Sequence, residues 1–335
     1  MVTICIPLYN GANFLHKCLE SAINQTHQDL EILVVDDFST DESVFIVKRF
    51  IEKDNRIRLI QNKENLGLVG NWNKAIQEST GKWIKMLFQD DILYPNCVEK
   101  MLSSCVNENK SVAICSRNFI INENISVSKK TFYNRKEIKI EHYFPIPQFV
   151  SPTEFSKTFT KDKLFFNFLG EPIALFIEKE LFNKYGLYDE DLVHLVDYEF
   201  LLRVIFNEGA YFIPEPLYDF RVHSGSESNK NHFSENNIKI FKFEYLEPLL
   251  LYNKYLTNKF FSSLRNKVGA RLIFNDALFY YHHKEINKQS KDSIEIKELL
   301  HKKFKKYPSF KLISIAANIV TVINNLKKAF LKLKK

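Results

Sequence analysis

The sequence predicts an α/β fold in which a mostly parallel sheet is flanked by helices. Short apolar runs alternate with segments whose apolar residues recur at helical spacing, which is typical of strand–helix–strand units. The strand-like runs are almost entirely apolar, as expected of strands that are buried on both faces. Three of them end in polar residues, at Tyr9-Asn10, Asp36-Asp37 and Asp90-Asp91. Ligands of such sheets bind outside the carboxyl ends of the strands, so we expect the site there; ordinary loops rich in Asp and Asn are the alternative.

The elements follow one another closely along the chain. Ser39 or Thr40 is placed to cap the second helix, because hydroxyl oxygens accept hydrogen bonds from the first N–H groups of a helix. In order, we expect a strand from Val2 that ends in Pro7-Leu8-Tyr9-Asn10, a helix at 14–23, a strand at 32–37, a helix at 44–51, a strand at 57–60, a helix that ends near Gly81, a strand at 83–88 and a strand at 112–115.

The carboxylates of Asp90 and Asp91 directly follow the apolar run 83–88. Ionised carboxylates at the end of a buried strand are costly unless a cation meets them. Mg²⁺ and Mn²⁺ prefer oxygen ligands and commonly lie between one or two carboxylates and the phosphates of a substrate. The pair therefore suggests a divalent metal that carries a diphosphate, and a solvated turn is the alternative.

Taken in combination, the motifs resemble the family 2 glycosyltransferases, which have a GT-A fold. The likeness rests on Ile-Pro-Leu-Tyr-Asn, Val-Val-Asp-Asp-Phe-Ser-Thr-Asp, Asn-Leu-Gly, Gly-Lys-Trp-Ile and Gln-Asp-Asp-Ile-Leu-Tyr-Pro, and it runs from Val2 to about Ser228. The resemblance implies that a nucleotide-sugar is the donor. Its donor-binding residues in this chain would be Pro7, Tyr9 and Asp37 for base and ribose, Asp36 in support, Asn73, Asp90 and Arg221.

The resemblance also implies a metal site that holds Mn²⁺ or Mg²⁺. Asp91 and His223 would be its ligands, and an imidazole is a competent ligand for Mn²⁺. Arg221 would reach the diphosphate, because a guanidinium pairs well with phosphate oxygens. Gln89 departs from the pattern, since the family often has Asp at this position.

Asp197 matches the acceptor-side carboxylate that serves the family as general base. The match is partial, because Val196 stands where an acidic neighbour is frequent. Capping of the helix 198–206 is the alternative role for Asp197, and one carboxylate can do both.

Composition limits the other possibilities. The chain has 335 residues, 45% of them hydrophobic, so it can bury an α/β domain and an accessory region. Its five cysteines have no paired spacing and favour a reducing compartment over disulfides or zinc. The strand that opens at Val2 leaves no signal peptide, and no apolar run is long enough to span a bilayer. No GxGxxG follows the first strand, which disfavours a dinucleotide oxidoreductase.

We expect two regions. Residues 1–228 would form the catalytic domain, and residues 229–335 a helical region that ends in a basic amphipathic tail from about Lys302. Such a tail fits an anionic membrane surface, which would place the protein in the cytoplasm, peripheral on the inner face of the cell membrane. Packing of the tail on the protein's own helices is the alternative. The net charge of +7 is concentrated at the tail and not on a recognisable nucleic-acid motif, so no nucleic-acid partner is expected.

The combined prediction is an inverting, metal-dependent glycosyltransferase. It would move a sugar from a UDP-linked donor to a glycan or lipid-linked saccharide acceptor in surface polysaccharide synthesis. The alternative is a non-catalytic relative that binds nucleotide-sugars or glycans, which would be expected to lack the base supplied here by Asp197.

Overall fold

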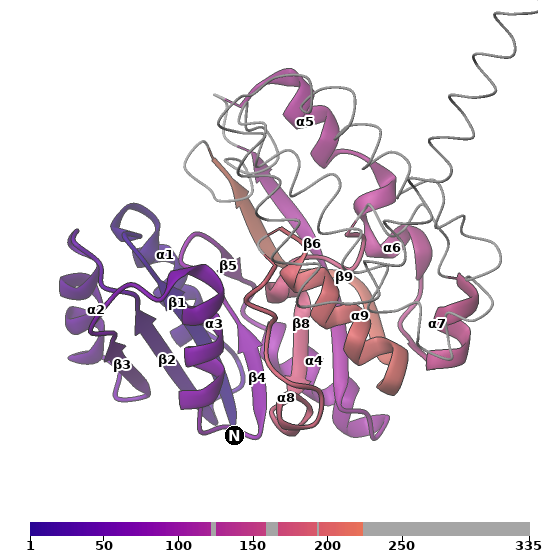
Figure 1. Ribbon diagram of the computed structural model, residues 1–335, viewed down its shortest axis with the longest axis horizontal. Coiled ribbons are helices and arrows are strands. Elements are labelled where there is room, and N and C mark those ends of the chain that lie inside the picture. Colours follow the sequence, from indigo (N-terminus) through magenta and orange to yellow (C-terminus); the bar gives the residue numbers. More distant parts are fainter. Residues whose placement is uncertain (122–124, 159–166, 193, 224–335) are drawn as a thin grey trace, which may run out of the picture. The chain divides into compact units, whose positions relative to one another are not determined.

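The computed structural model describes residues 1–121, 125–158, 167–192 and 194–223, which belong to one compact unit that extends from Met1 to Asn229 (Figure 1). The predicted helical region at 229–335, with its basic tail, lies outside the described residues. The division into two regions therefore stays a prediction.

In the described part of the chain, nine strands form one mixed sheet in the order β3-β2-β1-β4-β8-β6-β9-β5, with β7 paired to β9. The neighbours in β3-β2-β1-β4 are parallel, as are β6 and β9, whereas β5, β7 and β8 run against their partners. The expected α/β fold with a mostly parallel sheet is confirmed. The strands are β1 (Val2–Leu8), β2 (Leu30–Asp36), β3 (Ile57–Gln61), β4 (Trp83–Met86), β5 (Ile92–Leu93), β6 (Val112–Ile121), β7 (Gln148–Val150), β8 (Leu175–Glu178) and β9 (Ala210–Val222).

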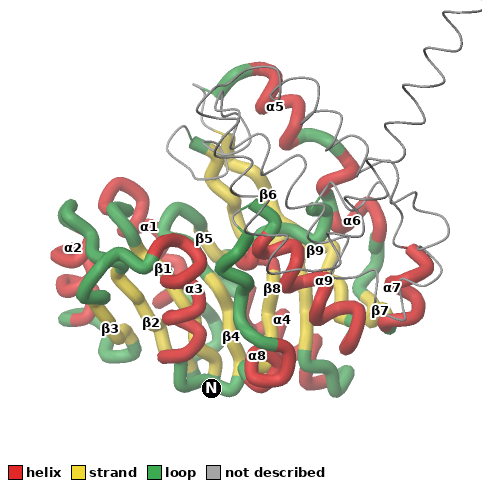
Figure 2. Tube along the Cα trace, in the orientation of Figure 1, coloured by secondary structure: helices red, strands yellow, loops and turns green. Residues whose placement is uncertain are grey.

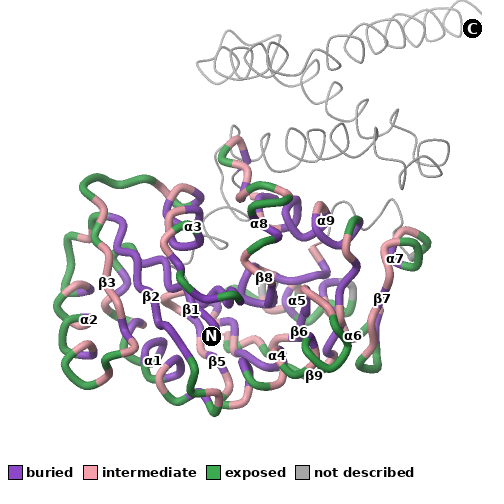
Figure 3. Tube along the Cα trace, turned by 90° about the horizontal axis from the view of Figure 1, so that it is seen from below, coloured by how far each residue is buried: buried purple, intermediate pink, exposed green. Residues whose placement is uncertain are grey.

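Helices cover both faces of this sheet, with α3 and α9 on one face and α1 and α4 on the other (Figures 1 and 3). Figure 2 shows how loops connect these helices to the strands. The helices are α1 (Ala12–Ile23), α2 (Ser43–Ile51), α3 (Gly67–Glu78), α4 (Cys97–Asn107), α5 (Val127–Tyr133), α6 (Ile140–Tyr143), α7 (Pro152–Thr158), α8 (Glu180–Tyr185) and α9 (Val196–Glu208), with short 3-10 turns η1 (Lys136–Ile138) and η3 (Pro172–Ala174).

The predicted cap of α2 is wrong. The helix begins at Ser43, and Asp41 accepts a hydrogen bond from the Ser43 N–H at 3.0 Å. Ser39 Oγ instead accepts from the Asn10 N–H, and the Thr40 N–H donates to the Asn10 side chain. The sequence places a hydroxyl near the helix, but the turn after β1 competes for it.

The central strands are buried along their whole length, as their apolar sequence predicts. Every residue of β1 and of β2 is buried. All five cysteines are buried and free. The strands that carry the polar ends are thus fixed by the core.

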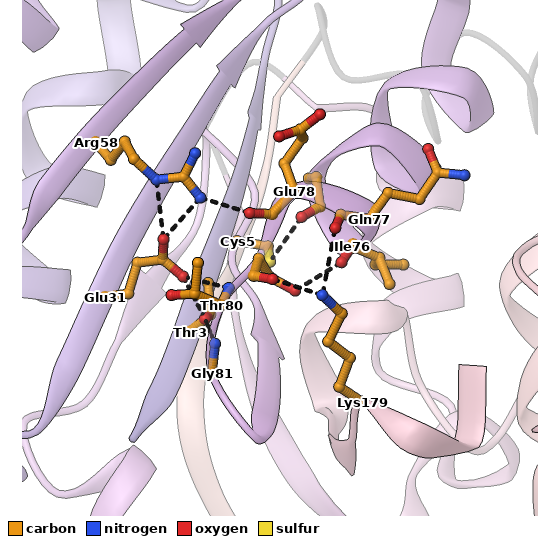
Figure 4. Close-up of polar contacts among 12 residues, drawn as sticks. Thr3, Cys5, Glu31, Arg58, Ile76, Gln77, Glu78, Thr80, Gly81 and Lys179 are labelled. Carbon is orange, nitrogen blue, oxygen red and sulfur yellow. Dashed lines mark hydrogen bonds and ion pairs between the residues drawn. The ribbon is translucent and has the colours of Figure 1, made fainter. Parts of the chain in front are cut away.

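A hydrogen-bonded cluster anchors the edge of the sheet at which β1 and β2 begin (Figure 4). Glu31 accepts hydrogen bonds from Thr3 Oγ1 at 2.6 Å, from the Thr80 N–H at 2.8 Å and from Arg58 at 2.7 Å. These partners come from β1, β3 and the end of α3, so one buried carboxylate joins three elements. Its pKa is lowered: burial acts to raise it, but the hydrogen bonds outweigh that effect.

Two cations stabilise the carboxyl end of α3 in the same cluster (Figure 4). Arg58 donates to the Glu78 carbonyl, and Lys179 donates to the carbonyls of Gln77 and Ser79. The last carbonyls of a helix lack partners within the helix, and positive charge there is favourable. The cluster therefore fixes the carboxyl end of α3 at the edge of the sheet opposite the polar strand ends.

Candidate active site

The structure brings the three polar strand ends to one edge of the sheet. Strand β1 lies between β2 and β4, and all three run parallel, so their carboxyl ends meet. In this register Leu8 pairs with Asp36. Pro7 is buried in β1, whereas Tyr9 just beyond the strand is 49% exposed. Tyr9 therefore presents its ring at this edge, as the predicted base contact requires.

Gln89 holds the backbone of Tyr9 in place. Its Oε1 accepts from the Tyr9 N–H at 2.8 Å, and its Nε2 donates to the Tyr9 carbonyl at 3.1 Å. A Cβ atom on Gly11 would come within 2.6 Å of the Gln89 amide, so a larger residue at position 11 would displace this amide. A carboxylate cannot donate the second hydrogen bond. The departure at Gln89 thus has a structural role that the sequence did not reveal.

The first turn of α1 is capped by the protein itself. The Gly11 N–H donates to Ser43 Oγ at 2.9 Å, and the Ala12 N–H donates to Asp41 at 3.1 Å. Free N–H groups at a helix start commonly bind phosphate, but here these two are used. We therefore expect the diphosphate to be bound elsewhere at this edge.

Asp37 and Asp36 have different surroundings. Asp37 is buried and accepts hydrogen bonds from the N–H groups of Leu66 and Gly67, at 2.7 and 3.0 Å, and from Asn62 at 2.9 Å. It therefore ties β2 to the start of α3. Asp36 is buried too, and its Oδ1 has no hydrogen-bond partner among the described residues. The donor-binding roles of both carboxylates stay predictions.

Asn73 does not join the polar strand ends. Its amide donates to the Tyr188 carbonyl and accepts from the Tyr188 N–H, both at 3.0 Å, and it also contacts Glu190. The side chain is buried, so these contacts use it to hold the loop before α9 against α3. The geometry gives no support to the donor-binding role expected for Asn73.

His223 lies beside Asp90. His223 Nε2 is 3.1 Å from Asp90 Oδ2, and its ring stacks on Phe14 with centroids 4.2 Å apart. Arg221 donates to the carbonyls of Asp90 and Phe14, and its guanidinium lies over the Phe14 ring. Phe14 on α1 thus supports both basic residues at the end of β9.

Asp91 is buried beneath this pair. Its Oδ1 accepts from the Arg221 N–H at 3.0 Å, and its Oδ2 has no hydrogen-bond partner in the described part of the chain. Burial, reinforced by the neighbouring charge of Asp90 and then of Glu171, raises the pKa of Asp91 well above its ordinary value. The hydrogen bond from the Arg221 N–H and the charge of Arg221 act in the opposite direction but do not outweigh burial.

A divalent ion fits this arrangement. Asp90 and His223 already face each other, and the unpartnered oxygen of Asp91 adds a buried acceptor. No three His, Cys, Asp or Glu side chains of the described residues are grouped as a complete metal site. Mg²⁺ sites often use one or two carboxylates and take the remaining oxygens from substrate phosphates, so an incomplete protein set is compatible with the prediction.

Asp197 lies in the first turn of α9, at its second residue. Its Oδ1 accepts from the Tyr198 N–H at 2.6 Å, and its Oδ2 accepts from the Asn167 amide at 3.1 Å. Burial, followed by the negative charge of Glu171, raises its pKa to about 7, against the opposing effects of hydrogen bonds from the backbone of Tyr198 and Asp197 and of the Arg117 charge. Because Leu195 is the N-cap residue of α9, Asp197 does not cap the helix in the way the alternative required.

Glu171 is a site residue that the sequence reasoning missed. Its carboxylate lies 3.4 Å from Arg117 Nε, and Tyr218 donates to it at 3.3 Å. Its charge raises the pKa of both Asp91 and Asp197, so it lies within electrostatic reach of both. Glu171 stands in Gly170-Glu171-Pro172, and nothing in these neighbouring residues indicates a role for its carboxylate.

The fold and these strand-end carboxylates define a GT-A protein, in agreement with solved structures. S. aureus TarS, residues 1-349 in complex with UDP, superposes with a TM-score of 0.56 at 16% identity, covering 77% of this chain and 65% of that chain. Mannosyltransferase PcManGT from Pyrobaculum calidifontis, in complex with GDP-Man and Mn²⁺, gives 0.54 at 15% identity, covering 95% and 86%. The predicted fold class is confirmed.

The sequence matches identify the family. Residues 3–168 match the model described as glycosyl transferase family 2. An uncharacterized glycosyltransferase of Methanocaldococcus jannaschii is 30% identical over 225 residues, which are 66% of this chain and 71% of the relative. The chain therefore belongs to glycosyl transferase family 2, and the predicted membership is confirmed.

Other relatives are similar over different shares of their length. An uncharacterized glycosyltransferase of Rickettsia prowazekii is 30% identical over 234 residues, which cover 68% of this chain and 66% of the relative. The hyaluronan synthase of Pasteurella multocida is 25% identical over 273 residues, 77% of this chain but 26% of its own length. The match thus leaves about a third of the first relative, and most of the second, without a counterpart.

Proposed function

We propose that this protein is an inverting glycosyltransferase that moves a sugar from a UDP-linked donor to a saccharide acceptor. The observation that carries the proposal is the Asp197 carboxylate, which stands at the start of α9 with a pKa of about 7. A general base works best when its pKa lies near the working pH, because it is then both ionised and able to hold a proton. An ordinary surface carboxylate does not meet this condition.

The proposed reaction divides between two parts of the site. Asp197 takes the proton of the acceptor hydroxyl while that oxygen attacks the anomeric carbon from the face opposite the diphosphate, which inverts the configuration. Each oxygen of Asp197 already accepts one hydrogen bond, from Tyr198 and Asn167, so the carboxylate is held in one orientation. Groups fixed in advance in this way need no rearrangement when the reaction occurs.

The diphosphate is assigned to the Asp90–His223 end of the site. Asp90, Asp91 and His223 would hold Mn²⁺ or Mg²⁺, whose contribution when bound is to stabilise the negative charge of the leaving diphosphate. This set widens the predicted pair of Asp91 and His223, because His223 contacts Asp90. Arg221 keeps the Asp90 loop against β9 through the Asp90 carbonyl and the Asp91 side chain.

The comparisons support a nucleotide-sugar donor. TarS has been solved with UDP and with UDP-GlcNAc, and PcManGT with GDP-Man and Mn²⁺. A base contact by the exposed ring of Tyr9 suits stacking on uracil, and we keep UDP as the proposed carrier.

The proposed acceptor is a glycan or a lipid-linked saccharide of surface polysaccharide synthesis. None of the described helices has the length and apolar character needed to cross a membrane. The basic tail that would bring the protein to an anionic membrane surface on the cytoplasmic side lies outside the described residues. Membrane association therefore rests on the sequence of the tail.

A panel of nucleotide-sugars tests the proposal. The purified protein is incubated with each donor and Mn²⁺, and release of free nucleoside diphosphate is measured, with the anomeric configuration of the product read by NMR. We expect release from a UDP-sugar, an inverted product, and loss of turnover in Asp197→Asn. Glu215→Gln is a suitable control, because Glu215 is exposed and pairs with Lys100. Tight UDP binding without turnover of any donor would instead indicate a non-catalytic relative.

A further inference from the structure

A short turn, Asn167–Gly170, lies against the base. The Gly170 N–H donates to Asn167 Oδ1 at 3.1 Å, and Asn167 Nδ2 donates to the Gly170 carbonyl at 2.8 Å. One side-chain amide therefore closes the turn from both sides. Its second amide hydrogen is directed to Asp197 Oδ2, at a distance of 3.1 Å between nitrogen and oxygen.

Buried residues inside the turn and a glycine at its end hold the turn in place. Phe168 and Leu169, between the two ends, are fully buried, and the Phe168 ring packs edge-on against Tyr198 in the first turn of α9. Gly170 has φ +96°, and a Cβ atom there would come within 2.6 Å of the Arg117 guanidinium. The turn thus depends on glycine, and its packing leaves Asn167 little freedom to move relative to Asp197.

Both hydrogens on the amide nitrogen of Asn167 take part in hydrogen bonds. An amide nitrogen has two hydrogens, and here one goes to Gly170 and the other to Asp197. The Asn167 oxygen is occupied by the Gly170 N–H, which fixes the orientation of the amide. A flipped amide would lose all three hydrogen bonds.

We propose that Asn167 is a positioning residue for the base, which holds the Asp197 carboxylate in one orientation by donating a hydrogen bond to its Oδ2. The inference rests on the proposed role of Asp197 and adds a residue to it. A donor to a carboxylate stabilises its ionised form over its protonated form. Asn167 therefore also keeps part of the Asp197 population ionised near neutral pH.

Other groups around Asp197 act on the same equilibrium. Glu171, next to the turn, opposes ionisation through its negative charge, and Arg117 on β6 favours it. Tyr188, on the loop before α9, is buried, and its pKa is raised by burial and then by the charge of Asp197. Asn167 is neutral, so its replacement by alanine removes hydrogen bonds without changing the charge around the base.

Two substitutions separate positioning from support of the turn. Asn167→Ala removes the donor and the closure of the turn together, whereas Asn167→Asp keeps an acceptor for the Gly170 N–H but replaces the donor with a second carboxylate. Removing the donor is expected to move the acidic limb of the kcat profile up by about one pH unit, and to lower kcat at pH 6 about tenfold. Asn167→Asp is expected to move the acidic limb to still higher pH, since a like charge beside Asp197 adds to the effect of the lost hydrogen bond. KM for the nucleotide-sugar should not change.

The measurement uses the full chain, with Asn207→Ala as control, because Asn207 is exposed on α9, the helix that carries Asp197, and donates to the Arg203 carbonyl. The pH dependence of kcat is recorded for each variant. The pKa of Asp197 is followed independently by difference infrared titration of the carboxyl band, taking Asp197→Asn as the reference. The infrared titration requires no activity, so it decides the inference even if no donor is turned over.

Equal pH profiles and equal Asp197 titrations in the wild type and both Asn167 variants would overturn the proposal and leave Asn167 with a purely structural role. If the infrared titration shows a different Asp197 pKa in the wild type and in the Asn167 variants, but the wild type turns over no nucleotide-sugar, the proposed function is refuted and the role of the hydrogen bond is retained. Should Asn167→Ala fail to fold, Asn167→Asp alone decides between these outcomes.

Discussion

Replacing Asp197 by asparagine is expected to abolish turnover and yet to stabilise the folded protein at pH 7. The pKa of Asp197 rises from 3.8 to about 7, because of burial first and the charge of Glu171 second. A carboxyl group whose pKa is raised in the folded state lowers the free energy of unfolding once the pH exceeds its pKa in the unfolded chain. This loss grows with pH until the pH reaches the folded-state pKa. A shift of this size corresponds to at most about 4 kcal/mol at pH 7.

Asparagine removes this cost but introduces a smaller one. Its oxygen can still accept from the Tyr198 N–H, which leaves its amide nitrogen facing the amide nitrogen of Asn167. Two donors that face each other cost about 1–2 kcal/mol, so the net stabilisation expected at pH 7 is about 2 kcal/mol. The advantage should shrink as the pH falls, vanish near pH 5, where the cost of the wild-type carboxylate has dropped to about 1–2 kcal/mol, and reverse by pH 4, where that carboxyl is protonated in the folded protein.

Urea unfolding between pH 4 and pH 8 measures this difference, and the release assay measures turnover. Turnover should fall about a hundredfold or more, the usual range for loss of a general base. Glu208→Gln, at the other end of α9, is the control of opposite sign. Burial acts to raise the pKa of Glu208, but hydrogen bonds from Lys184 and Tyr185 outweigh it and lower the pKa, so that variant should lose stability at pH 7.

This expectation is refuted if Asp197→Asn is no more stable than the wild type at pH 7 and the difference does not vary with pH. In that case the carboxylate would not be held at a cost. Unchanged turnover in the same variant would place the base elsewhere. Glu199 is a poor substitute, because it is fully buried and pairs with Arg203 at 2.8 Å.

Four further outcomes are expected. Calorimetry should find that UDP binding needs Mn²⁺ or Mg²⁺ and collapses in Asp91→Ala, whereas equal affinity in EDTA would refute the metal site. Gln89→Glu, which removes the donor to the Tyr9 carbonyl, should weaken UDP binding about tenfold, the effect of one hydrogen bond, with kcat at saturation unchanged. Glu31→Ala should lower the free energy of unfolding by about 2 kcal/mol, since it leaves a partly exposed Arg58 without its carboxylate partner. Full-length protein should float with anionic but not neutral liposomes, and a version without the tail from about Lys302 should not; equal flotation of both would assign the tail a structural role.

Much of the sheet edge could be predicted because its signals are local. Apolar runs gave the order and approximate bounds of β1, β2, β3, β4 and the start of β6, and a parallel arrangement then required their polar ends to converge. The same reasoning placed Tyr9, Asp36 and Asp90 at one edge. It could not give β6 its full length to Ile121, because the pattern beyond Cys115 alternates where the strand leaves the core.

The partners of the site residues were decided by contacts between distant segments. His223 is 133 residues from Asp90 in the sequence, and only the position of β9 in the sheet sets it beside that carboxylate. Asn73 was assigned to the donor, but the loop before α9 takes both ends of its amide.

The sequence by itself determined the fold class, the family and the strand ends at which the chemistry is expected. Each of these depends on residue types at fixed local spacing, which the chain carries whatever its tertiary contacts. Only the tertiary structure decided how Asp197, the proposed base, is held, through the Asn167 turn and the charge of Glu171. Burial and the approach of charges from other elements set the properties of a carboxylate, and neither is encoded in the residues beside it.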